Sequence, residues 1–238
     1  MLSLLVMLLF APFAWICSLF VSGKREYEKN NRFYRWMLNA YTYLAFRFLR
    51  VKIHIRGMEK VPQGTRFTLV GNHRSKFDPM ITWLVFREYD LAFISKPSNF
   101  NVFIFGKFIR KCCFMAIDRE NPRNALKTAE KASGLLLKNE VSIGVYPEGK
   151  RAKTEEMLPF HNGVFKIAQR ADVPIVNVAL VGTDKIAKRT PWKRTHVYLE
   201  VCDVIPKEEV KVMRTVQIGE RVRNTLEQTI QRIKENGV

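Results

Sequence analysis

One short segment of the chain combines residue types that suit proton transfer. His73 and Asp78 lie five positions apart in the run Asn72-His73-Arg74-Ser75-Lys76-Phe77-Asp78. A histidine, with an ordinary pKa of about 6.5, can take the proton of a hydroxyl group as that oxygen acts as a nucleophile. A carboxylate on the other ring nitrogen fixes the tautomer and orientation of such a base. The spacing lets Asp78 fold back toward His73, so the pair is a catalytic hypothesis.

Each of the two residues also has an ordinary structural interpretation. Asp78 precedes Pro79, and an acidic residue followed by proline is typical of a capped helix N-terminus. A single histidine on a loop is more often a surface residue than a catalytic one. One carboxylate has lone pairs for both a cap and an imidazole, so the two interpretations of Asp78 are compatible.

A second segment places cations beside a glycine. Lys150 and Arg151 follow Gly149 at the end of an apolar run, in Tyr146-Pro147-Glu148-Gly149-Lys150-Arg151. Such cations could bind a phosphate monoester, and the glycine would let the backbone approach it closely. Glu148 could hold one of the cations or a substrate hydroxyl. The alternative is an ordinary Pro-Gly turn with solvated charges. Arg119, which also follows an apolar run, is either a phosphate ligand or a member of a surface ion pair.

These segments lie at the ends of predicted strands. Apolar runs predict strands over Val51–Ile55, Phe67–Val70, Leu91–Ile94, Phe114–Ile117, Val141–Tyr146, Ile175–Leu180 and Val197–Val204. Helical patterns cover Pro79–Arg87, Asn101–Arg110, Pro122–Lys138 and Asn162–Ala171, with a final helix within Lys207–Lys234. Asn121 before Pro122 is a second expected helix cap. The alternation predicts an α/β domain with a largely parallel or mixed sheet flanked by helices, whose ligands bind at strand ends.

The first fifty residues differ from the rest. Met1 to Val21 carries no charged side chain and, at about 1.5 Å per residue, would reach roughly across a bilayer as a helix, although Pro12 interrupts it. The alternative is a buried core helix. Lys24 to Arg50 mixes aromatic and basic residues, which suits either the lipid headgroup layer or an amphipathic helix packed on the domain. We therefore expect membrane-anchoring helices over 1–50 and a catalytic domain over 51–238.

The net charge indicates an anionic partner. The chain has 40 Lys and Arg against 22 Asp and Glu, which gives +18. Nucleic acid, an anionic membrane and phosphorylated substrates all fit this excess. The charge-free N-terminal segment favours anionic membrane lipid and no nucleic-acid motif is present, so we expect no nucleic acid partner. Because Lys24 and Arg25 follow the apolar run, we expect the domain on the cytoplasmic side of the cell membrane. The four cysteines have no metal-site spacing and suggest a reducing compartment.

Four segments, taken in order, resemble the motifs of the glycerolipid acyltransferase family, which includes the 1-acyl-glycerol-3-phosphate acyltransferases. The family motif N-H-x-S-x-x-D is matched by Asn72, His73, Ser75 and Asp78. The motif F-P-E-G-T-R-S corresponds to the run from Tyr146 to Ala152, which contains Pro147. The other two are the apolar run that closes on Arg119 and the segment Val173–Val178. Lys96, ten positions ahead of Gly106, fits a further family pattern.

The resemblance implies a role for each matching residue. His73 would be the general base and Asp78 would orient it. The residues expected to bind the acceptor's phosphate are Glu148, Gly149, Arg151, Arg119 and Lys96, while Asn72, Ser75 and Pro147 support the motifs. The implied fold is the α/β fold of glycerol-3-phosphate acyltransferases. The implied reaction transfers a fatty acyl group from acyl-CoA or acyl-ACP to the 2-hydroxyl of lysophosphatidic acid, giving phosphatidic acid for phospholipid biosynthesis, with no bound cofactor or metal.

Departures from the family pattern and rival functions leave alternatives open. Lys150 and Ala152 replace the usual Thr and Ser beside the expected acceptor site, so another lysolipid acceptor is an alternative. A lipid esterase or thioesterase would need a Ser or Cys nucleophile. The chain has no Gly-x-Ser-x-Gly elbow, and Ser75 is the nearest hydroxyl to His73. A non-enzymatic binder of anionic lipid or nucleic acid is the remaining alternative.

Overall fold

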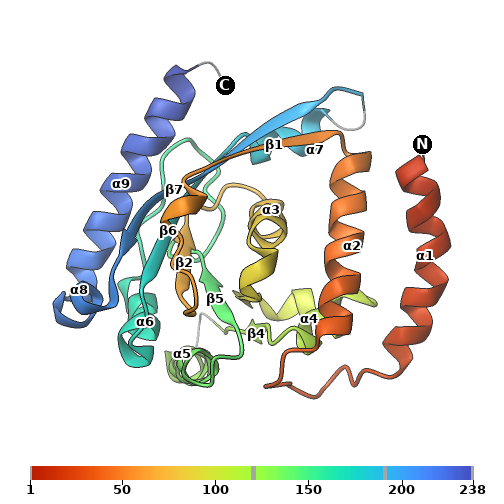
Figure 1. Ribbon diagram of the computed structural model, residues 1–238, viewed down its shortest axis with the longest axis horizontal. Helices are drawn as coiled ribbons and strands as arrows, with labels where there is room; N and C mark the ends of the chain where they lie inside the picture. Colours follow the sequence, from red (N-terminus) through yellow and green to blue (C-terminus); the bar gives the residue numbers. More distant parts are fainter. Residues whose placement is uncertain (1, 119–121, 190–191, 237–238) are drawn as a thin grey trace.

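A single mixed sheet organises the described part of the chain. The computed structural model describes residues 2–118, 122–189 and 192–236. Within these residues seven strands lie in the order β1-β7-β6-β2-β5-β3-β4 (Figure 1). Their bounds are β1 Val51–Arg56, β2 Thr68–Gly71, β3 Leu91–Ser95, β4 Met115–Ala116, β5 Ser142–Val145, β6 Ile175–Val181 and β7 Thr195–Ile205. All neighbouring pairs are parallel except β6 and β7, which run antiparallel. The predicted α/β fold with a largely parallel or mixed sheet is confirmed.

Helices cover both faces of this sheet. Their bounds are α1 Leu2–Leu19, α2 Arg32–Phe48, α3 Asp78–Val85, α4 Phe105–Lys111, α5 Pro122–Leu137, α6 Lys166–Ala171, α7 Ile186–Arg189, α8 Lys207–Val212 and α9 Thr215–Glu235. Short 3-10 turns are η1 Met58–Lys60, η2 Arg87–Tyr89, η3 Pro97–Asn101, η4 Asn162–Phe165 and η5 Thr183–Lys185. In Figure 1, α5, α6, α8 and α9 lie on one side of the sheet, and α2, α3 and α4 on the other.

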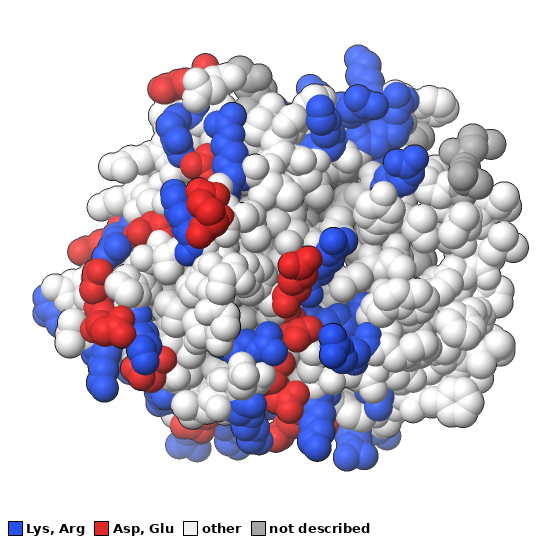
Figure 2. Space-filling view, in the orientation of Figure 1, with Lys and Arg blue, Asp and Glu red and all other residues white. Residues whose placement is uncertain are grey.

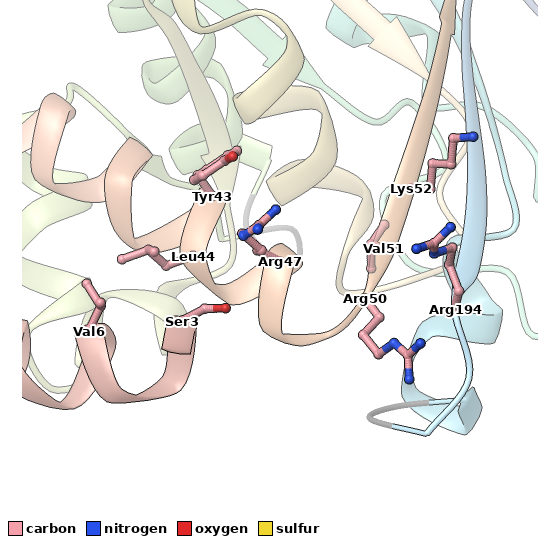
Figure 3. A pocket seen from close by; sticks show the side chains of 9 residues that line it. All are labelled: Ser3, Val6, Tyr43, Leu44, Arg47, Arg50, Val51, Lys52 and Arg194. Carbon is pink, nitrogen blue, oxygen red and sulfur yellow. The ribbon is translucent and has the colours of Figure 1, made fainter. Parts of the chain in front are cut away.

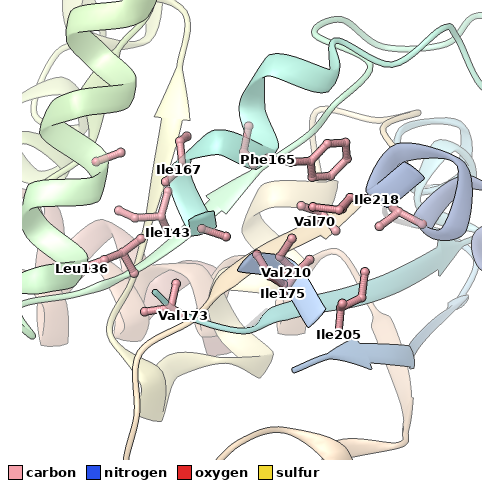
Figure 4. Close-up of a cluster of buried hydrophobic side chains, with 14 of the residues drawn as sticks. Val70, Leu136, Ile143, Phe165, Ile167, Val173, Ile175, Ile205, Val210 and Ile218 are labelled. Atoms are coloured by element: carbon pink, nitrogen blue, oxygen red, sulfur yellow. The ribbon is translucent and has the colours of Figure 1, made fainter. Parts of the chain in front are cut away.

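Strand β6 shows how the sequence builds the two layers. It is an unbroken run of buried residues, and its alternate side chains enter different clusters. Ile175 and Ala179 pack in the cluster under α5, α6 and α9, part of which Figure 4 shows, while Val176 and Val178 pack in the cluster under α2 and α3. A strand that is buried on both faces reads as a nearly continuous apolar run, because neighbouring side chains point to opposite faces, and in β6 only Asn177 interrupts it.

Each predicted strand overlaps an observed strand, whereas several helix boundaries differ. The predicted helix from Asn101 begins as the turn η3, and α4 starts only after Ile104, whose φ is 57°. The predicted final helix divides into α8 and α9, because Met213 and Arg214 adopt extended backbone between them. The local backbone conformation sets these helix boundaries, and the spacing of apolar residues in the sequence does not predict it. The expected cap Asn121 lies outside the described residues.

Helices α1 and α2, with the segment that joins them, form a helical hairpin over residues 2–48. Helices α1 and α2 run antiparallel side by side, and Ala14, Tyr34 and Met37 pack together with Phe108 of α4. Leu5, Leu8, Leu9, Phe13, Ile16 and Leu19 of α1 remain exposed. Among the residues that the structure describes, no helix is both long and apolar enough to cross a membrane.

Helix α2 packs on the domain through a buried cation. Arg35 is 4% exposed, and its guanidinium donates to the carbonyl oxygens of Leu91 (2.8 Å) and Cys112 (3.4 Å). It also pairs with Asp90 at 3.3 Å and lies 4.5 Å from the centre of the Trp83 ring. Burial lowers the pKa of Arg35 from its ordinary value, while the charge of Asp90 opposes that shift. The guanidinium thus joins α2 to the start of β3 and the end of α4.

Arg35→Ala should therefore destabilise the domain. Removing the guanidinium deprives two carbonyl oxygens of this donor, and breaking a buried ionic contact of this kind costs about 3–5 kcal/mol. Denaturant unfolding followed by circular dichroism measures the change in the free energy of unfolding. Arg32→Ala, an exposed position on the same helix, is the matched control and should cost less than about 0.5 kcal/mol. Equal losses in the two variants would contradict this role for Arg35.

Candidate active site

The loop after β2 starts from a strand end that is held tightly against β6. A Cβ atom on Gly71 would come within 2.7 Å of the carbonyl oxygen of Val178, so only glycine fits there. The Asn72 side chain, 1% exposed, donates to the carbonyl oxygen of Leu180 (2.9 Å) and accepts from the Leu180 N–H (2.8 Å). This amide continues the pairing of β2 with β6 past the end of the strand. The start of the loop that carries His73 is consequently held in a fixed position against β6.

The Asp78 carboxylate, which is fully buried, gathers the loop around itself. Its Oδ2 lies 2.9 Å from His73 Nδ1 and accepts from the backbone N–H groups of Arg74 (2.7 Å) and Ser75 (2.6 Å). Its Oδ1 accepts from Thr183 Oγ1 (2.5 Å), at the turn η5. With the Nδ1 proton shared with Asp78, Nε2 is the ring nitrogen left to accept a proton. The His73 side chain keeps 15% of its surface exposed.

The interpretation of Asp78 as a helix cap is wrong. Helix α3 begins at Asp78 itself, Phe77 occupies the cap position, and the Phe77 side chain makes no capping hydrogen bond. The reason is that the carboxylate points back to the N–H groups of Arg74 and Ser75, before the helix, rather than forward into it. The Asp78 carboxylate therefore binds His73 and the loop of His73, and it does not cap helix α3.

An aromatic stack supports the imidazole from one side. The His73 and Tyr146 rings lie 4.5 Å apart with planes 20° from parallel, and the Phe93 ring follows 6.0 Å beyond Tyr146. The Tyr146 hydroxyl lies 3.2 Å from Thr82 Oγ1. Burial raises the pKa of Tyr146 well above its ordinary value, and the charge of Asp78 adds to that rise. Tyr146 is thus a neutral packing surface that limits rotation of the His73 ring.

Glu148 holds the backbone of the same loop. Its side chain is 1% exposed, with Oε1 accepting from the His73 N–H (2.6 Å) and Oε2 from the Leu158 N–H (2.9 Å). The carbonyl oxygen of His73 in turn accepts from the Ala152 N–H (2.8 Å). Burial raises the pKa of Glu148, and the two N–H donors oppose that rise. The carboxylate expected at the phosphate is therefore bonded to two amides of its own chain, which makes Glu148 a positioning residue for His73.

Gly149 is required by conformation and by space. Its φ is +71°, in the left-handed region that favours glycine, and a Cβ would come within 2.9 Å of the His161 ring. The His161 N–H donates to the carbonyl oxygen of Pro147 at 2.9 Å, which closes the turn. Pro147 and Gly149 thus shape the loop that carries Glu148 and Arg151.

The expected phosphate ligands follow neighbouring parallel strands. Arg151 lies on the loop after β5 and Lys96 directly after β3, and both side chains are exposed. Because β2, β5 and β3 are parallel, these loops leave the sheet at the same edge as His73. Arg119 lies outside the described residues. No phosphate-binding role of these cations is tested by the geometry, so the assignment stays a prediction.

The alternative nucleophiles are occupied or buried. The Ser75 hydroxyl donates to the carbonyl oxygen of Thr183 (3.1 Å) and accepts from the Phe77 N–H (3.2 Å). Burial raises the pKa of both Cys112 and Cys113 to about 12, which disfavours the thiolate form that attacks. This arrangement disfavours a serine or cysteine hydrolase and leaves His73 as the group placed for proton transfer.

The raised pKa of Glu148 predicts a pH dependence of stability. Its folded-state pKa exceeds the ordinary value of 4.5, so above that pH the folded chain binds more protons than the unfolded chain. The contribution of this group to the free energy of unfolding therefore falls as the pH rises from 4.5 through the folded-state pKa. Denaturant titrations of the wild type and Glu148→Gln across that range should show the stability difference shrinking with rising pH. Glu156→Gln, an exposed neighbour, is the control, and a difference that grows with pH would contradict the assignment.

Comparisons with known proteins identify the family. The sequence pattern of the acyltransferase family matches residues 52–181. A chloroplast 1-acyl-sn-glycerol-3-phosphate acyltransferase of Brassica napus is 32% identical over 136 residues, covering 57% of this chain and 39% of that protein. A 1-acyl-sn-glycerol-3-phosphate acyltransferase alpha of Ovis aries is 24% identical over 215 residues, covering 88% of this chain and 72% of that protein.

The fold agrees with that assignment. The crystal structure of the 1-acyl-sn-glycerophosphate acyltransferase PlsC from Thermotoga maritima matches with a TM-score of 0.73 and 19% identity, covering 95% of this chain and 89% of that one. The family pattern extends over more than half of this chain and includes both the His73–Asp78 loop and the loop from Glu148 to Arg151. The protein therefore belongs to the acyltransferase family.

Proposed function

We propose that the protein transfers a fatty acyl group from a thioester to the 2-hydroxyl of 1-acyl-sn-glycerol-3-phosphate, giving phosphatidic acid for phospholipid biosynthesis. The observation that carries the proposal is the pairing of His73 Nδ1 with the buried Asp78 carboxylate, which leaves Nε2 available as a base. The names of the Brassica napus and Ovis aries relatives support this acceptor. Acyltransfer to a different lysolipid is the narrower alternative.

The reaction needs one base that later acts as an acid. His73 Nε2 takes the proton of the acceptor hydroxyl as its oxygen bonds to the thioester carbon. When the tetrahedral intermediate collapses, the carbon–sulfur bond breaks, and the imidazolium returns its proton to the leaving thiolate. Asp78 stabilises the imidazolium between these steps and holds the ring in one tautomer. Glu148 and Tyr146 keep the backbone and the ring in place, so that little orientation is lost during turnover.

The cations on the loops near His73 are the proposed ligands of the acceptor's phosphate. We propose that Arg151, with Lys96 and Arg119, binds the phosphate monoester, because charge-assisted hydrogen bonds hold an anion and orient its hydroxyl. Gly149 lets the loop approach the phosphate. We assign Glu148 to His73 rather than to the phosphate, since a buried carboxylate would repel that group.

The setting of the reaction is likewise a proposal. The donor is acyl-CoA or acyl-ACP used as a co-substrate, and no bound cofactor or metal is needed for the steps above. The exposed apolar face of α1 beside basic residues supports attachment to anionic membrane lipid. We place the domain on the cytoplasmic side of the cell membrane, because Lys24 and Arg25 follow the apolar segment.

The catalytic pair predicts large losses of acyl transfer. In Asp78→Asn an NH₂ group replaces one carboxylate oxygen, and it cannot accept the hydrogen bonds that this oxygen accepts now. The tautomer of His73 is then no longer fixed. The transfer rate onto 1-acyl-sn-glycerol-3-phosphate should fall by about 10²- to 10⁴-fold in Asp78→Asn and in His73→Ala. Asp172→Asn, an exposed aspartate substitution, should leave the rate unchanged. A folded variant of His73 with a near-normal rate would refute the mechanism.

The phosphate assignment predicts a selective effect on acceptor binding. Arg151→Ala should raise KM for 1-acyl-sn-glycerol-3-phosphate by about tenfold or more and change kcat little, because a hydrogen bond to a charged group contributes about 1.5–3 kcal/mol. Lys153→Ala removes an exposed cation from the same loop and is the matched control. Steady-state assays with both acyl-CoA and acyl-ACP should include a monoacylglycerol acceptor. The assignment fails if Arg151→Ala affects the phosphate-free acceptor equally.

A further inference from the structure

The lining of one cationic pocket includes none of the residues assigned to chemistry. It has a volume of about 700 Å³ and forms where the start of α1 and the end of α2 meet the starts of β1 and β7 (Figure 3). Arg50, Lys52 and Arg194 lie on one side of it, and Val6 and Leu44 lie on the other. One side can therefore receive an anion, while the other offers an apolar surface.

The charges of the pocket are unbalanced. Arg47, Arg50, Lys52 and Arg194 are all exposed, and the described residues that line the pocket include neither Asp nor Glu. Within the described residues, none of these four cations is within ion-pair distance of a carboxylate. Like charges that line one pocket repel each other, and an anion bound in the pocket relieves this repulsion. The pocket is thus complementary to a phosphate group.

An exposed tryptophan adjoins this pocket. Trp192, on the segment between α7 and β7, is 83% exposed, and its carbonyl oxygen accepts from Arg50 Nη1 at 3.0 Å. Lys188, Arg189 and Lys193 are exposed beside it. Figure 2 shows Lys and Arg side chains gathered in this region, next to the uncharged face of α1. A tryptophan among basic residues suits the headgroup layer of a membrane, where the ring is buried and the cations reach phosphates.

We propose that this pocket and Trp192 form a membrane-docking surface, which binds the headgroup phosphate of an anionic phospholipid. The cations take the phosphate, and Val6, Leu44 and the exposed side chains of α1 contact the acyl region. A bilayer supplies both chemistries at once, whereas a soluble phosphate supplies only the anion. The surface extends the membrane contact beyond the N-terminal fifty residues to β1, β7 and the segment that precedes β7.

Vesicle binding of the full chain tests the pocket without either acyl-transfer substrate. Arg47→Gln/Arg194→Gln should weaken binding to phosphatidylcholine vesicles that contain phosphatidylglycerol by about thirtyfold, because each cation near such a surface contributes about 1 kcal/mol. Binding to phosphatidylcholine alone should be unchanged. Both side chains are exposed, so the variant should fold, and unfolding titrations check this. The result is independent of the proposed enzymatic function.

A matched double variant controls for net charge. Lys127→Gln/Lys211→Gln removes the same charge from exposed positions on α5 and α8 and should reduce binding severalfold less. Equal weakening by the two double variants would overturn the proposal, because net charge alone would then explain binding. A loss of binding to a DNA duplex without a loss of vesicle binding would also overturn it, in favour of a nucleic-acid site.

Tryptophan fluorescence tests the position of Trp192. The difference between the emission spectra of the wild type and Trp192→Phe isolates this side chain from Trp15, Trp36 and Trp83. With phosphatidylglycerol-containing vesicles the difference spectrum should shift to shorter wavelength, because the ring leaves water. The absence of a shift while the protein is bound would show that Trp192 stays in water and would overturn its part in the surface.

Discussion

The buried carboxylate of Asp78 is the interaction on which the candidate site depends. It binds two separate segments of the chain: the loop after β2, through the imidazole of His73 and the N–H groups of Arg74 and Ser75, and the turn after β6, through the hydroxyl of Thr183. A carboxylate this deeply buried is stable only when its lone pairs meet donors, and here all the named partners can donate. The hydrogen bonds that stabilise the buried charge of Asp78 therefore also fix the orientation of the His73 imidazole.

The direction of the strands determines what lies near this carboxylate. Strand β1 is parallel to β7, which is antiparallel to β6, while β6 is parallel to β2. Consequently β1 begins at the edge of the sheet where β2 ends. That single reversal brings the end of α2, the cationic pocket and the loop of His73 to the same edge of the sheet. A surface that docks on the pocket would thus lie on the side where an acceptor lipid must reach the base.

Helix α2 links the N-terminal hairpin to the same arrangement. Arg35 joins it to β3 and α4 through the domain interior, and the Phe46 ring lies 6.2 Å from that of Phe77, directly before Asp78. A helix that composition alone assigns to an anchor is therefore part of the packing behind the catalytic loop. Interiors are close-packed, so displacing α2 would disturb α3 and the loop it follows.

The sequence by itself determined the features that depend on a few neighbouring residues. The apolar run of β6, the spacing of His73 and Asp78, and the charge-free first helix each follow from side-chain period or composition over a few residues. Only the tertiary structure decided that Thr183 bonds to Asp78, that Glu148 serves the His73 backbone, and that Arg194 shares a pocket with Arg47. These contacts join residues 75 or more positions apart, and a local pattern carries no information on which distant segments the sheet brings together.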